Sequence, residues 1–207
     1  MLLRLTLLYV GLAIFGFAIQ AMVVADLGVP PWDVFHTGLA DLLGWSLGVT
    51  TVLVSFVVLL AWIPLRERPG LGTVSNAVLI GTFVDVAARV LPTDTPDSMA
   101  VRVAIVAAAI TVNGVATGMY IGARFGTGPR DGLMTGIARR RWSVRSVRTA
   151  IELSVLTAGV LLGGSIGFAT LAFALAIGPI AHHSIPFFTR MTTGEPRRGR
   201  LTVTTGV

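Results

Sequence analysis

The sequence contains no cysteine and no lysine. The absence of cysteine excludes disulfide bonds and thiolate metal ligands. Charge is also scarce, because 13% of the 207 residues are charged whereas 54% are hydrophobic, and the mean hydropathy is +0.81. A soluble domain carries about 25% charged residues. The composition therefore favours an all-α, polytopic helical membrane protein, with the lipid bilayer as its first partner.

All 16 basic residues are arginine, and with 10 acidic residues they give a formal charge of +6. In a soluble protein such a balance would indicate nucleic-acid binding. In a chain this apolar, arginine marks the cytoplasmic edge of a membrane instead. We therefore expect no nucleic acid as a partner.

A stretch at residues 25–40 returns at residues 123–138. Such internal repeats decide the fold class and have to be found first. After the repeated stretch, Trp45-Ser46 matches Trp142-Ser143 and Gly81 matches Gly178, now at a shift of 97. The identities at a shift of 98 are Ala25/Ala123, Gly28/Gly126, Pro31/Pro129, Asp33/Asp131, Thr37/Thr135, Gly38/Gly136 and Ala40/Ala138.

Six apolar runs have about the 20 residues that a membrane-spanning helix needs. The sequence thus predicts a first membrane repeat at 1–92, a linker at 93–102, a second membrane repeat at 103–189 and a disordered cytoplasmic tail at 190–207. Three spans per repeat make the two repeats inverted, as in many secondary transporters. The predicted spans are 5–25, 46–65, 71–91, 103–123, 146–163 and 167–188.

Arginine placement predicts the orientation. With six spans and both termini in the cytoplasm of a bacterium, 14 of the 16 arginines lie inside and only Arg89 and Arg102 outside. An eight-crossing alternative, in which the short segments after the repeated motif also span, splits the arginines 12 to 4. The positive-inside rule therefore favours six spans in the plasma membrane.

The repeated motif predicts a broken or half-helix after each Gly/Pro corner, at 32–43 and 130–141. About 12 residues of helix cover half a bilayer. Irregular backbone at that depth must line a cavity, and helix N-termini attract anionic or polar groups. The candidate solute-binding residues are Gly28, Pro31, Trp32, Asp33, Gly126, Pro129, Arg130 and Asp131.

Each of these candidates has a structural alternative. Asp33 and Asp131 are ordinary helix-opening residues after proline, a role we rank ahead of ligand contact. Trp32 is typical of interfacial anchors and Arg130 of charges on the cytoplasmic side. The short segments are also compatible with helices that span, or that lie on the membrane surface.

Two ionisable residues inside the predicted spans, Asp85 and His182, are repeat equivalents. Intramembrane ionisable groups indicate function by default, so both are proton-coupling candidates. The alternative for Asp85 is an ion pair with Arg89 four residues on, and Glu152 is expected to pair with Arg148.

The sequence shows no nucleophile–base set, metal-ligand spacing or phosphate loop, so we expect neither an enzyme nor a cofactor. The hypothesis it favours is a transporter or binder of a small polar or anionic solute, with a homo-oligomer left open. The alternative is a regulatory scaffold that holds a cytoplasmic partner or anionic lipid through the loop 139–148, with Arg139, Arg140 and Arg141.

The motifs at 28–33 and 126–133, with Gly72-Thr73, Asn76 and Ile80-Gly81, resemble the bacterial YczE/YyaS/YitT group of integral membrane proteins. The resemblance covers nearly the whole chain except the tail. It implies a small polytopic plasma-membrane protein, and it assigns no ligand-binding residue.

Overall fold

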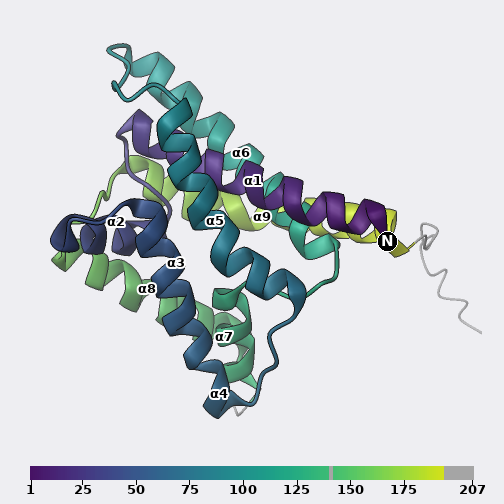
Figure 1. Ribbon diagram of the computed structural model, residues 1–207. Helices are drawn as coiled ribbons and strands as arrows, with labels where there is room; N and C mark the ends of the chain where they lie inside the picture. The colour runs from purple at the N-terminus through teal and green to yellow at the C-terminus, as the bar shows by residue number, and fades with distance from the viewer. Residues whose placement is uncertain (140–141, 194–207) are drawn as a thin grey trace, which may run out of the picture.

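The computed structural model describes residues 1–139 and 142–193, and over these residues it consists of helices and connecting loops without a β-strand (Figure 1). The all-α prediction is confirmed. In chain order the helices are α1 (Leu2–Ala25), α2 (Pro31–Leu43), α3 (Leu47–Leu60), α4 (Trp62–Leu65), α5 (Leu71–Val90), α6 (Met99–Gly122), α7 (Pro129–Ala138), α8 (Val144–Leu161) and α9 (Phe168–Thr193).

Five helical stretches are long and apolar enough to cross a membrane: α1, α3 together with α4, α5, α6 and α9. At most 44% of the most apolar 18-residue stretch of each is buried within the protein. The stretches therefore have side chains available to contact lipid. They coincide with five of the six predicted spans. The sixth predicted span is α8, whose 18 residues are helical but include Arg145, Arg148 and Glu152, and it is not among the five.

The helices pack in two groups. In the first, α1 lies along α6 and also contacts α5, while α6 packs on α9 (Figure 1). In the second, α2 packs on α8, and α7 contacts α3, α4 and α8. Leu8, Val84 and Tyr120 belong to an apolar core of the first group, and Trp32 and Met134 to one of the second. The groups are joined by a third core, in which Val34 of α2 packs with Met22 and Phe173, and by the packing of α3 on α5.

The two repeated corners have the same backbone. Asp26 and Arg124 end the preceding helices with φ of 48° and 58°, in the left-handed region. Two residues on, Gly28 and Gly126 have φ of 104° and 121°, which residues other than glycine rarely adopt. The shared glycine of the repeat is therefore a requirement of the chain reversal.

Each corner is held by the opposite half of the chain. The Arg4 guanidinium donates to the carbonyl oxygens of Ala123 and Arg124 at 2.9 and 3.0 Å. Its repeat equivalent, Arg102, donates to the carbonyl oxygens of Ala25, at 2.7 Å, and Asp26. In the same way, the N–H of Gly72 donates to the Phe125 carbonyl and that of Ala169 to the Leu27 carbonyl, both at 2.8 Å. Equivalent residues of the two halves therefore make equivalent contacts with the opposite corner.

The ends of several elements differ from the predictions. Helix α6 begins at Met99, inside the predicted linker, and α9 continues to Thr193, past the predicted end of the second repeat. The disordered tail predicted for 190–207 lies outside the described residues from position 194 on, as do Arg140 and Arg141 of the predicted basic loop.

Candidate functional site

The two corners meet at a cavity of about 520 Å³. The first corner contributes Pro31 and Trp32 to its wall, and the second contributes Gly128, Arg130 and Asp131. Helices α2 and α7 both begin here, so their N-terminal ends adjoin the cavity. Unpaired N–H groups at such ends favour an anionic or polar ligand.

The wall is built from equivalent positions of the two halves. In several pairs of repeat-equivalent residues, both members line the cavity, one from each half of the chain. In two of these pairs, one member is an amide and the other is aromatic. The cavity therefore lies between the halves and not inside either one. The pairs are Phe15/Asn113, Trp32/Arg130, Asn76/Phe173 and Ile80/Ile177.

Arg130 stacks on its repeat equivalent, with its guanidinium carbon 5.3 Å from the centre of the Trp32 ring. Among the described residues it has no carboxylate partner. Its position is fixed by Trp62 of α4, which donates from Nε1 to the Pro129 carbonyl at 3.0 Å and whose ring fills the space beside Gly132. A stacked guanidinium keeps its hydrogen-bond donors available for a planar anion.

Three other charged side chains of the wall, Asp131, Arg148 and Glu152, have hydrogen-bond or ion-pair partners within the protein. Tyr120 donates its hydroxyl to Asp131 at 3.2 Å, and Arg148 forms an ion pair with Glu152 at 2.9 Å. The second contact confirms the predicted Arg148–Glu152 pair. These contacts leave Arg130 as the charge of the wall best placed to meet a solute.

Two polar side chains of the wall are buried without a hydrogen-bond partner in the described protein: Trp32, at Nε1, and Asn113, at both amide atoms. Asn113 is 1% exposed. An unsatisfied buried polar group costs about 1–3 kcal/mol. Such groups at a cavity indicate a site for a polar ligand.

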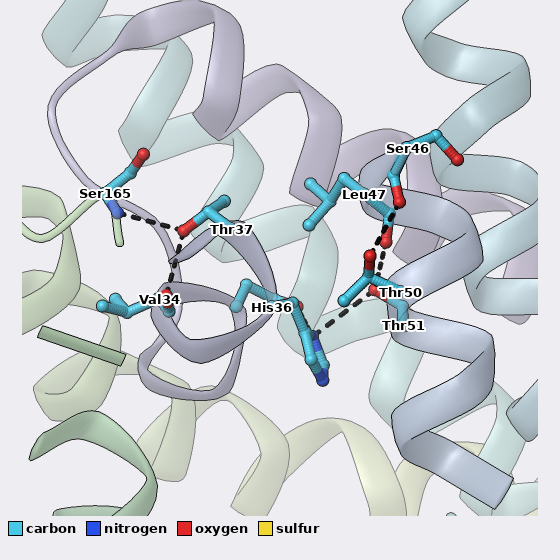
Figure 2. A network of polar contacts seen from close by, with 9 residues as sticks. Val34, His36, Thr37, Ser46, Leu47, Thr50, Thr51 and Ser165 are labelled. Carbon is cyan, nitrogen blue, oxygen red and sulfur yellow. Dashed lines mark hydrogen bonds and ion pairs between the residues drawn. The ribbon is translucent and has the colours of Figure 1, made fainter. Parts of the chain in front are cut away.

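Asp33, predicted as a solute ligand, does not line the cavity. Its carboxylate is buried, and Oδ1 lies 2.8 Å from Nδ1 of His36. The same His36 nitrogen lies 3.4 Å from the Thr51 hydroxyl (Figure 2). Successive side chains of a helix point about 100° apart, which directs Asp33 away from the cavity that its neighbour Trp32 lines. Gly28, Gly126 and Pro129 likewise shape the corners and are not part of the wall.

The network of Figure 2 also fixes the start of α2. The Thr37 hydroxyl donates to the Val34 carbonyl and accepts from the Ser165 N–H, both at 3.0 Å. Ser165 belongs to the loop after α8. The first half-helix is thus tied to the second half of the chain, which holds Trp32 in place at the cavity.

The two proton-coupling candidates lie in different surroundings. His182 is exposed and lines the cavity. Asp85 is outside the cavity and accepts hydrogen bonds from the Ser46 hydroxyl at 2.6 Å and the Gly48 N–H at 2.9 Å. No ion pair of Asp85 with Arg89 occurs among the described residues, where Asp85 instead caps the start of α3.

Sequence reasoning missed the buried His36, and it did not place Tyr120, Asn76 or Asn113 in the site. The three-residue spacing of Asp33 and His36 within one short helix was the available signal, because such residues lie on one face. The part of the chain that the structure describes holds no cluster of three histidine or acidic side chains that could bind a metal ion. Arg139 pairs with Glu67 at 2.6 Å.

Comparison with known proteins places the chain in a family. Residues 2–186 match the family of unknown function DUF6198. The chain is 34% identical to the membrane protein YczE of Bacillus subtilis, over 89% of this chain and 86% of the relative, and 26% identical to YyaS of the same organism, over 92% and 96%. It is also 34% identical to a Haemophilus influenzae protein, over 90% and 85%. No solved structure matches. The chain belongs to the DUF6198 family, the resemblance to the YczE and YyaS group is confirmed, and the protein is a helical membrane protein.

Proposed function

We propose that this membrane protein binds a small solute with an acidic group in the central cavity, as the binding step of transport across the membrane. The observation that carries the proposal is the guanidinium of Arg130, stacked on Trp32 and without a carboxylate partner in the described protein, at the meeting point of two helix N-termini.

The proposed architecture is an inverted repeat of two three-helix units with both termini in the cytoplasm of a bacterium. The support is the matched set of corner contacts: Arg4 and Arg102, like Gly72 and Ala169, each reach across to the other half. In this architecture α8 is the sixth crossing helix. Transporters with inverted repeats bind substrate near the middle of the membrane, between the repeats, where helices are broken.

The wall chemistry supports an organic anion over an inorganic ion. Apolar side chains such as Phe15, Ile80 and Phe173 surround the polar groups. A volume near 520 Å³ lies in the range of about 300–1,000 Å³ typical of small-molecule sites. We therefore propose a solute with a carboxylate or phosphate at Arg130, a hydrogen-bonding group at Asn113 and an apolar body.

His182 is the proton-coupling residue that we propose, because it is an ionisable side chain inside a predicted span and lines the cavity. Asp85 is hydrogen-bonded to α3 and is assigned a different role below.

The test is stabilisation of the purified protein by two probes of nearly the same size and shape, of which one carries a negative charge and the other is neutral. Benzoate should raise the midpoint of thermal unfolding, because a ligand that binds the folded state stabilises it, whereas benzamide should do so far less. Arg130→Gln should abolish the benzoate effect. Arg68→Gln, on an exposed arginine outside the cavity, is the matched control and should retain it.

Equal stabilisation of the wild type and Arg130→Gln by benzoate would remove Arg130 from the site. Equal stabilisation by benzoate and benzamide would overturn the acidic-group assignment.

A further inference from the structure

The two halves have equivalent corners, but their outer helices pack differently. Helix α3 lies against α5, with the backbones of Gly48 and Gly81 in direct contact. Its repeat equivalent, α8, makes no comparable contact with α9 among the described residues and packs on α2 instead. The first half thus has a tight contact between α3 and α5, whereas the equivalent helices of the second half, α8 and α9, lie apart.

Single residues report the same asymmetry. A Cβ atom on Gly81 would collide with the Gly48 carbonyl, whereas at the equivalent Gly178 nothing lies within 4 Å. Gly178 is part of the cavity wall, as are Arg148 and Glu152 of α8, so the cavity extends between α8 and α9.

The closed contact has a polar latch, which consists of Asp85, Ser46 and the N–H of Gly48. The equivalent residues of Asp85 and Ser46 are His182 and Ser143. They are not bonded to each other in the described protein, since Ser143 pairs with Ser146 at 2.8 Å and His182 faces the cavity. The residue equivalent to Gly48 is Arg145. A corresponding contact between α8 and α9 would therefore involve the Arg145 side chain.

We infer that these contacts exchange. In a second state α8 lies on α9 across Gly178, the Asp85 latch is released, and the cavity opens between α3 and α5 instead. Because the two repeats are related by an inversion across the membrane, the exchange would expose the same cavity to the opposite side. This inference rests on the proposed function, and it supplies the step that turns binding into transport.

The second state predicts a specific change in exposure. Val84 and Ala181 are equivalent residues 97 positions apart. Ala181 lines the cavity, whereas Val84 is fully buried at 0% exposure. In the second state Val84 would line the cavity and Ala181 would be covered.

The absence of native cysteine makes this exposure measurable. Val84→Cys and Ala181→Cys are introduced separately, and the rate of reaction with a water-soluble maleimide is measured on the full-length protein in detergent. The thiol introduced at position 181 should react quickly and the thiol at position 84 slowly. Adding Asp85→Ala should raise the rate at 84 by about tenfold or more and lower the rate at 181, because the latch hydrogen bonds are charge-assisted.

Gly178→Val is the second variant. Its Cβ atom would have no neighbour within 4 Å in the present state, whereas its side chain would fill the surface on which α8 would dock. In the Asp85→Ala background it should return both rates toward those of the protein with an intact latch. Ser46→Ala, which removes one of the latch hydrogen bonds, should change both rates in the same direction as Asp85→Ala but less, and it serves if Asp85→Ala does not fold.

Faster labelling at 84 without slower labelling at 181 would mean that α3 frays alone, and would overturn the exchange. Unchanged rates at both positions in the latch variants would do the same. The assay needs no solute, so its failure leaves the benzoate result intact, and loss of benzoate binding leaves the labelling result intact.

Discussion

At the scale of single residues, the structure separates two aspartates that the repeat makes equivalent. Asp131 lines the cavity and accepts from Tyr120, whereas Asp33 is buried beside His36. The repeated Pro-x-Asp pattern could not distinguish them, because the partner of each aspartate is missing from the other half. Met22 stands at the position equivalent to Tyr120, and Met134 at the position equivalent to His36.

The buried pair of Asp33 and His36 gives the first prediction. His36→Ala should lower the free energy of unfolding by about 3–5 kcal/mol, because it leaves a buried carboxylate without its partner. Chemical denaturation in detergent micelles measures the loss. His183→Ala removes an exposed imidazole and should change little. A loss for His36→Ala no larger than for His183→Ala would show that the pair contributes no stability.

The unpartnered amide of Asn113 gives the second prediction. Asn113→Leu should raise the free energy of unfolding by about 1 kcal/mol, because an apolar group of similar size replaces buried polar atoms without partners. The same change should weaken stabilisation by benzoate. A variant that is less stable and binds benzoate normally would contradict a ligand-facing role of Asn113.

At the scale of elements, the sequence predicted most helices within a few residues and located both corners. Gly, Pro and the apolar runs act locally, so the sequence alone reveals them. It did not predict that α4 would be separate from α3, that Trp62 would hold the start of α7, or that Asp85 would cap α3. These features depend on contacts between segments distant in the chain.

The corner glycines give a prediction at this scale. Gly28→Ala should lower the free energy of unfolding by about 2 kcal/mol or more, because φ is 104° and a Cβ atom would press on Thr170 Oγ1 at 2.7 Å. Gly44→Ala is the matched control, at a positive φ but with open space around it, and should cost about 1 kcal/mol. Equal losses would show that the corner is loosely packed.

At the scale of the whole molecule, the two halves hold each other's corners and enclose one cavity. The sequence predicted the repeat and named residues of both corners as candidate solute-binding residues, but it did not predict the different packing of α3 and α8. Both halves carry the same pattern, and only the three-dimensional arrangement shows which half is closed. The inverted orientation of the halves stays a prediction that follows from arginine placement.

That orientation is the central claim, and a matched pair of labelling sites tests it most directly. Asp41 and Arg139 are exposed, equivalent residues 98 positions apart, after the first and second motifs. The single variant Asp41→Cys should react with a membrane-impermeant maleimide in intact cells, and the single variant Arg139→Cys only after the membrane is permeabilised. Reaction of both from the same side of the membrane would contradict the inverted repeat and the transport mechanism built on it.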